Sequence, residues 1–340
     1  MRLSAIGDCC HTLAVVRAIQ DAWPETKITW IIGRIEHQLL QDVDGVEFII
    51  FDKAAGWRGY LDIRKQLSDR RFSILLHMHA SLRANFLTRC IKADRIIGFD
   101  RQRARDYQWL FTKERIAPAD QQHVLDGMLS FIEHIGITPG ELRWDIPIPD
   151  EARAYARGVC AGQRPAFVIS PCSSQRFRNF RNWDVARYIK LGNELINRHG
   201  GKIILTGGPS DLEKQYGEAI VDGIGIPAIN LIGKTTLKEL IALIECADVV
   251  ICPDSGPAHM ATATSTPVVG LYATSNRHRT GPYLSQHLVA DRYPEAIEKE
   301  FGKPVEKLRW GQRVRNPDAM DLIQVRDVLE KTALALNPSA

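Results

Sequence analysis

Short runs of consecutive apolar residues alternate along this 340-residue chain with longer segments of helical periodicity. Uninterrupted apolar strands that alternate with helices predict parallel β-sheets covered by helices on both faces, an α/β architecture. The predicted strands are 27–32, 46–51, 72–78, 95–99, 166–171, 202–207, 249–253 and 267–273, and the predicted helices are 11–22, 58–70, 123–135, 183–199, 236–246 and 322–335.

The alternation is interrupted once, in the segment 139–165, which carries four prolines and no clear strand. After it the pattern restarts with "AFVISP" as a new first strand, and the chain length suits two domains. We therefore predict two Rossmann-like lobes, 1–148 and 149–320. A C-terminal helix at 321–340 is expected to pack back toward the N-terminal lobe.

The charge is small in total but unevenly distributed. The formal net charge of +4 does not indicate bulk nucleic-acid binding, and we predict no nucleic-acid partner. Between Arg58 and Arg105, however, 12 Lys and Arg stand against 4 Asp and Glu, and the stretch 299–315 has 6 against 2. Such basic surface either attracts an anionic partner, such as phosphates or lipid headgroups, or is simply solvated.

The seven cysteines include no C-x-x-C pair, and Cys9 and Cys10 are adjacent, which disfavours a bridge between them. With no signal-peptide pattern, reduced thiols in the cytoplasm are expected. No run approaches the roughly 18 apolar residues of a membrane span, so any membrane contact is expected to be peripheral.

Polar motifs follow several predicted strands, at the sheet edge where ligands bind in open parallel sheets. The first motif is "RLSAIGDCCHT" (2–12), in which a very short strand ends at Gly7 and Asp8 before a helix. Gly7 permits a tight turn. Asp8 is a candidate general base, or it only caps the following helix.

The second motif, "SPCSSQRFRNFRNW" (170–183), combines two hydroxyls with arginines and asparagines just past a strand. Hydroxyls, amide groups and guanidinium forks suit a pyrophosphate, whereas a solvated polar loop is the alternative. The polar residues are Ser173, Ser174, Arg176, Arg178, Asn179, Arg181 and Asn182.

Two glycine-containing turns follow later strands. In "LTGGPSDLEK" (205–214), Gly207 and Gly208 allow close backbone approach, and Asp211 either holds ribose hydroxyls or caps a helix. In "PDSGPAHMATATSTPVVGLYATS" (253–275), Asp254, Ser255 and Gly256 stand at a helix N-terminus, a natural anion site.

Other chemistry finds little support. His77 and His79 share a strand face without an obvious third metal ligand, so no metal site is predicted. Neither a G-x-S-x-G nor a Walker nor a kinase signature is present.

Together these motifs resemble the ADP-heptose:lipopolysaccharide heptosyltransferases, glycosyltransferase family 9. The matching segments are "SAIGDCCHT", "SSQRFRNFRNW", "LIGKTTLKELIALIECADVVI", "DSGPAHMATATSTPVVGLYATS" and "RTGPY", and they extend over nearly the whole chain. The resemblance implies the GT-B fold, with parallel sheets of two lobes facing a central cleft. It implies an inverting transfer of L-glycero-D-manno-heptose from ADP-heptose to the acidic sugar Kdo of the lipopolysaccharide inner core, without a metal or other cofactor.

The resemblance also assigns roles to individual residues. It implies that Asp8 is the base, that the N-terminal lobe receives Kdo–lipid A at the inner membrane leaflet, and that the C-terminal lobe holds the donor. The expected donor-binding residues are Ser173, Ser174, Arg181, Gly208, Asp211, Lys234, Asp254, Ser255, Gly256, Pro257, His259 and Thr274. The expected acceptor-binding residues are His11, Arg83, Arg101, Arg103 and Arg105. His259 is expected to brace its turn rather than to move protons.

Two departures from the family pattern stand out. Arg181 occupies the position where the family usually has a lysine, which keeps the charge but changes the phosphate geometry. Family members also carry several apolar residues before the first motif, whereas only Met1 precedes Arg2 here, so either the first strand is unusually short or the start at Met1 lies inside the gene.

Three alternatives remain open at this point. One is transfer of a later heptose onto an already heptosylated core. Another is a different GT-B enzyme, such as a sugar-nucleotide epimerase that takes a uridine nucleotide. The third is a sugar-nucleotide-binding protein without catalytic activity. ADP release and product analysis distinguish them.

Overall fold

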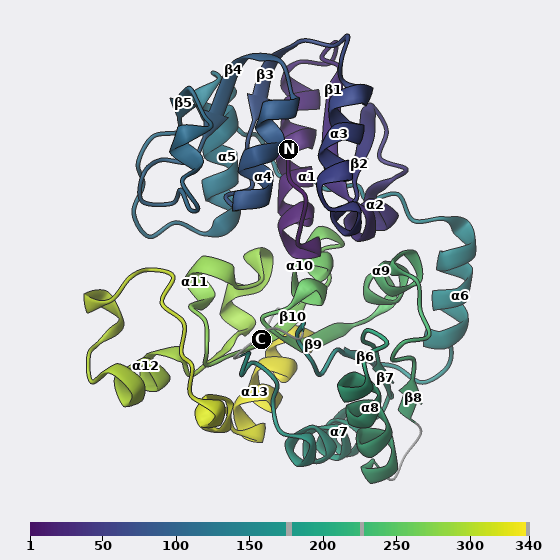
Figure 1. The fold of residues 1–340 in the computed structure, drawn as a ribbon. Coiled ribbons are helices and arrows are strands. Elements are labelled where there is room, and N and C mark those ends of the chain that lie inside the picture. The colour runs from purple at the N-terminus through teal and green to yellow at the C-terminus, as the bar shows by residue number, and fades with distance from the viewer. Residues whose placement is uncertain (175–178, 225–227, 338–340) are drawn as a thin grey trace. The chain divides into compact units, whose positions relative to one another are not determined.

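The computed structural model describes residues 1–174, 179–224 and 228–337, and the chain divides into two compact units. The units are Met1–Pro147 and Ile148–Ala340, so the division falls beside the predicted boundary after residue 148. Both have parallel sheets flanked by helices, as the sequence pattern predicts (Figure 1).

The second unit is built on a six-stranded parallel sheet with the strand order β11-β10-β9-β6-β7-β8. The first strand in sequence lies in the middle, and the chain runs outward from it twice, which is the Rossmann order. The strands are β6 (Ala166–Ile169), β7 (Lys202–Leu205), β8 (Ala228–Asn230), β9 (Val249–Pro253), β10 (Val268–Tyr272) and β11 (Ala290–Asp291). The direction of winding reverses between β6 and β9, so a ligand crevice is expected at their carboxyl ends.

Helices of the second unit begin at polar caps that the sequence supplies. Asp184, Ser210 and Thr236 each accept a hydrogen bond from a first-turn amide of the helix that follows. The helices are α6 (Asp150–Cys160), α7 (Val185–His199), α8 (Asp211–Gly223), α9 (Leu237–Cys246), α10 (Gly256–Ala263), α11 (Arg277–Thr280), α12 (Tyr293–Phe301) and α13 (Val325–Leu336).

Helices α6 and α13 of the second unit depart from the sequence-based expectation. The proline-rich connector contains α6, because the prolines lie outside the helix and Ala152, Ala156 and Cys160 form a buried stripe on it. The described part of 321–340 is not a separate segment. Val328 and Leu329 of α13 belong to the hydrophobic core of the second unit, where the helix packs on α7 and β10.

Trp183 anchors the loop that carries the serine–arginine motif. The side chain is fully buried, its Nε1 donates to the Ile323 carbonyl at 3.1 Å, and its ring meets Tyr188 edge to face at 5.1 Å. The Tyr188 hydroxyl donates to the Pro171 carbonyl at 3.1 Å. The loop is therefore fastened at both of its ends to the core beneath the sheet edge.

The first unit has two smaller parallel sheets, joined by residues 1–3. The strands are β1 (Ile28–Gly33) paired with β2 (Val46–Phe51), and β3 (Phe72–Leu76), β4 (Ala93–Gly98) and β5 (Glu114–Arg115) in that order. On one side, Arg2 N donates to the Ile31 carbonyl, and Gly33 N donates to the Leu3 carbonyl at 2.9 Å. On the other side, Met1 N donates to the Leu76 carbonyl at 2.7 Å.

Residues 1–3 therefore fill the place of a central strand, and the predicted short first strand is reduced to this segment. The helices of the unit are α1 (Ile6–Ala22), α2 (Arg34–Leu40), α3 (Trp57–Gln66), α4 (Leu82–Leu87) and α5 (Val124–His134). Helix α1 begins at Ile6, earlier than the predicted residue 11, so Gly7 and Asp8 lie in its first turn.

Among the described residues, no helix combines the length and apolar character that crossing a membrane demands. All seven cysteines are free thiols.

Replacing Trp183 with Phe is expected to lower the free energy of unfolding by about 2 kcal/mol, because an indole hydrogen bond and buried ring volume are lost. The measurement is the urea unfolding midpoint of the full chain. Trp23→Phe is the control, since Trp23 is 38% exposed and its replacement should change stability by less than about 0.5 kcal/mol. Equal midpoints for the two variants would contradict the anchoring role.

Candidate functional site

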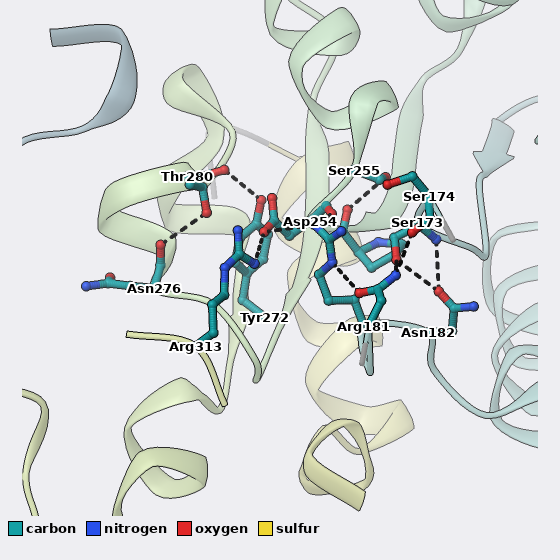
Figure 2. Close-up of polar contacts among 12 residues, drawn as sticks. Ser173, Ser174, Arg181, Asn182, Asp254, Ser255, Tyr272, Asn276, Thr280 and Arg313 are labelled. Atoms are coloured by element: carbon teal, nitrogen blue, oxygen red, sulfur yellow. Dashed lines mark hydrogen bonds and ion pairs between the residues drawn. The ribbon is translucent and has the colours of Figure 1, made fainter. Parts of the chain in front are cut away.

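The candidate site lies where β6 and β9 end, at the point where the sheet of the second unit reverses its winding. The two strands are hydrogen-bonded neighbours, with Val168 opposite Val250. Their carboxyl ends bring the described parts of the serine loop, 170–174 and 179–183, close to the turn 254–256, as Figure 2 shows. Two motifs that are about 80 residues apart in sequence thus form one cluster.

Side-chain amides hold the two serines in the loop. The Asn182 Oδ1 atom accepts hydrogen bonds from the Ser173 amide at 2.9 Å and from the Ser173 hydroxyl at 3.1 Å. Asn179 Nδ2 donates to Ser173 Oγ at 2.7 Å and to the Ser174 carbonyl at 2.8 Å. Ser173 is buried, whereas Ser174 is exposed. Arg176 and Arg178 lie outside the described residues.

Asp254 forms ion pairs with two arginines (Figure 2). The Arg313 Nη1 atom lies 2.8 Å from Asp254 Oδ2, and the Arg181 Nη1 atom lies 3.3 Å from the same oxygen. Arg181 also donates to the Asp254 carbonyl at 2.7 Å and to Asn179 Oδ1 at 2.7 Å. Arg181 therefore joins the serine loop to the turn after β9.

The charge of Asp254 is stabilised by these partners. The side chain is buried, and burial by itself raises a carboxyl pKa, but the positive charges of Arg313 and Arg181 outweigh it and lower the pKa of Asp254 to about 2. Asp254 is therefore ionised at neutral pH and neutralises part of the charge on two arginines. The remaining positive charge is available to an anion.

The turn after Asp254 leaves the start of α10 without a side-chain cap. Ser255 is the N-cap residue, but its hydroxyl donates to the Pro253 carbonyl at 3.0 Å instead of accepting from a helix amide. Gly256 and Pro257 are the first helical residues, and His259 is half-buried in the first turn. An uncapped helix N-terminus beside arginines is an environment that favours phosphate groups.

The segment after β10 forms the far side of the cluster (Figure 2). Thr274 is buried, and its carbonyl accepts from the Val314 amide at 3.1 Å, which brings the Arg313 segment alongside. Asn276 caps α11 by accepting from the His278 amide, and the Tyr272 hydroxyl donates to the Thr280 carbonyl at 3.0 Å. This polar end of β10 holds Arg313 next to Asp254.

The glycine turn after β7 is held by Glu213. Its carboxylate accepts from the Gly208 amide at 2.8 Å and from the Ser210 hydroxyl at 2.6 Å. Asp211 is exposed in the first turn of α8. Lys234 is exposed, and its Nζ donates to the Asn230 carbonyl at 2.9 Å. Gly208 and Asp211 follow β7, the neighbour of β6, and Lys234 follows β8 at the edge of the sheet.

Asp8 lies in the first turn of α1 in the first unit. Its Oδ2 atom accepts from the Ala5 amide at 3.3 Å and pairs with the Arg2 guanidinium, and about a third of the side chain is exposed. The carboxylate therefore caps the helix, while part of it stays exposed to solvent. His11, one turn later, is buried, with its ring 5.5 Å from that of His123.

The four arginines expected to bind the acceptor lie in α4 and in the loop after β4. Arg83, Arg101 and Arg105 are exposed. Arg103 is only partly exposed, and its guanidinium pairs with Asp100 and donates to Gln122 Oε1 and to the Ala117 carbonyl. Arg103 thus fastens its own loop, which the sequence does not reveal.

Several residues of the cluster were not predicted as donor-binding. Arg313 belongs to the second basic stretch, but nothing in its local pattern singled it out among six basic residues. Asn179 and Asn182 lie in the motif 170–183, but the sequence pattern assigns neither of them to donor binding. The family resemblance did not extend to 313, so only the fold brings that arginine to Asp254. Over the described residues, no three His, Cys, Asp or Glu side chains gather as metal ligands.

The chain is similar in sequence to known heptosyltransferases. The family model for glycosyltransferase family 9 (heptosyltransferase) matches residues 60–309. A lipopolysaccharide core heptosyltransferase, OpsX, from Haemophilus influenzae is 40% identical over 329 residues, covering 97% of this chain and 94% of that protein.

Solved structures agree on the fold. The family 9 glycosyltransferase of Veillonella parvula matches with a TM-score of 0.79 at 21% identity, covering 99% of this chain and 96% of that one. The Escherichia coli heptosyltransferase WaaC with ADP matches with a TM-score of 0.74 at 17% identity, covering 98% and 100%. The fold class is GT-B, as predicted. The chain belongs to glycosyltransferase family 9, the heptosyltransferases, and is an enzyme of that family.

Proposed function

We propose that this enzyme transfers a heptose from ADP-heptose to the Kdo region of the lipopolysaccharide inner core. The observation that carries the proposal is the cluster at the ends of β6 and β9, where hydroxyls, two arginines and an uncapped helix start come together. Such a cluster matches the needs of a sugar diphosphate. The relative OpsX is named a lipopolysaccharide core heptosyltransferase, and WaaC was solved with ADP, which supports the proposal.

The donor pyrophosphate is expected at the start of α10, with Ser173, Ser174 and Arg181 as further ligands. Negative charge grows on ADP as the bond to the sugar breaks. Preorganised dipoles and guanidinium groups stabilise that charge without reorganising. Gly208, Asp211 and Lys234 are expected to contact the nucleoside part, and Thr274 and His259 to shape the sugar side. The reaction is proposed to need no metal.

Asp8 is the proposed general base. It removes the proton of the acceptor hydroxyl as that oxygen attacks the anomeric carbon, and ADP leaves from the opposite face, which inverts the configuration. Arg2 stabilises the ionised carboxylate that this role requires.

The acceptor is proposed to be Kdo–lipid A at the cytoplasmic face of the inner membrane. This molecule is strongly anionic, and the first unit holds 12 Lys and Arg against 4 Asp and Glu between Arg58 and Arg105. Exposed Arg83, Arg101 and Arg105 are the proposed acceptor contacts. Arg103 instead holds its own loop in place. The enzyme is proposed to act as a peripheral membrane protein.

Addition of a later heptose is the second candidate function. It is supported by a relative from Escherichia coli that is named lipopolysaccharide heptosyltransferase 3 and is 26% identical over 98% of this chain. An epimerase and an inactive binding protein are less well supported as functions, because Asp8 would have no evident purpose in them beyond capping α1.

Replacing Asp8 with Asn is expected to lower the rate of heptose transfer by about 10²–10⁴-fold, because the proton acceptor is lost. ADP affinity should stay within twofold, since the donor cluster belongs to the other unit. Asp69→Asn, at an exposed site of the same unit, is the control. Full activity of Asp8→Asn with purified acceptor would exclude the base role and leave only the helix cap.

The acceptor is tested by product mass. With ADP-heptose as donor, Kdo–lipid A is expected to gain one heptose at least about tenfold faster than heptosylated core does. The reverse order of rates would favour the later-heptose function. Turnover of UDP-sugars without any lipid acceptor would favour an epimerase.

The ion cluster predicts a pH dependence. The folded-state pKa of Asp254 is about 2, below its ordinary 3.8, so its stabilising effect is fully present above about pH 4 and is lost as pH falls toward 2. The stability advantage of the wild type over Asp254→Asn should therefore shrink by about 2 kcal/mol between pH 5 and pH 2. Urea unfolding at both pH values measures it. A difference that is independent of pH would contradict the ion-pair assignment.

A further inference from the structure

Helix α4 and the short 3-10 helix η3 (Gln108–Leu110) present an unusual outer surface in the first unit. Ala84 and Leu87 bury one side of α4 in the core below α3. The outward side carries large apolar residues where polar ones are the rule. Five such side chains are between 44% and 66% exposed here: Leu82, Phe86, Tyr107, Trp109 and Leu110.

These side chains form one surface, because α4 and the loop 99–111 are tied together. Asp106 accepts from the Leu82 amide at 3.0 Å through its carboxylate and from Asn85 Nδ2 at 2.6 Å through its carbonyl. The rings of Phe86 and Phe111 meet edge to face at 5.3 Å. We call this set of five apolar residues the α4–η3 surface. Five of the eleven exposed large apolar side chains in the described chain gather there, so the exposure is not scattered.

A buried glutamine fixes the loop 99–111 beneath this surface. Gln108 is fully buried, and its side chain donates to the His77 carbonyl at 2.8 Å and accepts from the Phe99 amide at 3.1 Å. Asp106 and Tyr107, just before it, both have positive φ, +52° and +60°. For side chains such as Tyr this conformation costs on the order of 1 kcal/mol. The fold thus accepts strain and keeps Tyr107 and Trp109 on the outside.

The charges around the α4–η3 surface are positive. Arg83, Arg89, Arg101 and Arg105 are exposed on α4, on the turn after it and in the loop. Arg89 lies with its guanidinium carbon 5.1 Å from the Phe111 ring centre. Asp106, an exposed acid in the same loop, accepts from the Leu82 amide through its carboxylate. Aromatic and leucine side chains ringed by arginines match an anionic lipid interface, where rings sit at headgroup level.

We propose that the α4–η3 surface docks the enzyme on an anionic lipid surface. The proposal deepens the proposed function, on which it rests for its biological purpose, because a lipid-linked acceptor lies in such a surface. A second copy of the chain is a poorer occupant. Pairing two copies through this surface would bring four arginines of each copy together, and like charges oppose association.

The test is co-sedimentation of the full chain with vesicles. Phosphatidylcholine vesicles with about a third phosphatidylglycerol should bind at least about tenfold more tightly than pure phosphatidylcholine. Each arginine near an anionic surface is expected to raise the binding constant about fivefold. Salt screens such surface charges, so the affinity for anionic vesicles should fall when the salt concentration rises from roughly 0.05 to 0.5 M.

The variant is Trp109→Ala with Leu110→Ala, which removes two exposed apolar groups and no charge. Its affinity for anionic vesicles should fall about tenfold. Trp23→Ala with Leu334→Ala is the matched control, since both residues are exposed elsewhere and binding should stay within twofold. Leu82→Gln, which changes another residue of the α4–η3 surface, should also lower the affinity for anionic vesicles. Circular dichroism checks that all variants fold.

A further readout separates this proposal from the enzymatic one. Transfer to an acceptor freed of its acyl chains should be unchanged in Trp109→Ala/Leu110→Ala, whereas transfer to vesicle-bound acceptor should fall. Equal vesicle binding of variant, control and wild type would overturn the docking site. A variant-induced change from dimer to monomer, with lipid binding intact, would also overturn it in favour of self-association. Inactivity on every acceptor with normal lipid binding would instead refute the proposed function alone.

Discussion

The ion cluster of Asp254, Arg181 and Arg313 is the interaction on which the donor site depends. Each member comes from a different part of the chain: the turn after β9, the loop after β6 and the segment after α12. A buried carboxylate without its partners costs several kcal/mol, so the cluster ties the three segments to one another. Through Asn179, the same cluster also orients the two serines.

The strand order explains why these segments meet at all. In the second unit β6 lies between β7 and β9, so loops from the two halves of the sheet open at the same edge. In the first unit residues 1–3 fill the corresponding central place through backbone hydrogen bonds to β1 and β3. Asp8 follows that segment by one short turn. Asp8 therefore follows the central segment of the first unit, as the serine loop follows β6, a central strand of the second unit.

The sequence predicted the architecture well where the pattern was repetitive. The strand runs 46–51 and 249–253 match β2 and β9 residue for residue, because short, mostly apolar runs that end at an aspartate leave little freedom. Asp254 could be named because it stands directly after a strand, and Ser173 and Arg181 because they lie in the polar motif that follows β6. Arg313 could not, because its position depends on the 3.1 Å hydrogen bond between Val314 and Thr274, a long-range contact without a local signature. Helix α6 was missed because the prolines on either side of it concealed its buried stripe of small residues.

A double-mutant cycle between Asp254 and Arg313 tests most directly whether the ion cluster organises the donor site. ADP affinity is measured for the wild type, Asp254→Asn, Arg313→Met and the double variant. The account predicts that each single change weakens ADP binding and that the two effects are coupled by at least about 1.5 kcal/mol, as for contacting charged groups. Additive effects, or ADP binding that neither change alters, would show that the cluster does not organise the site.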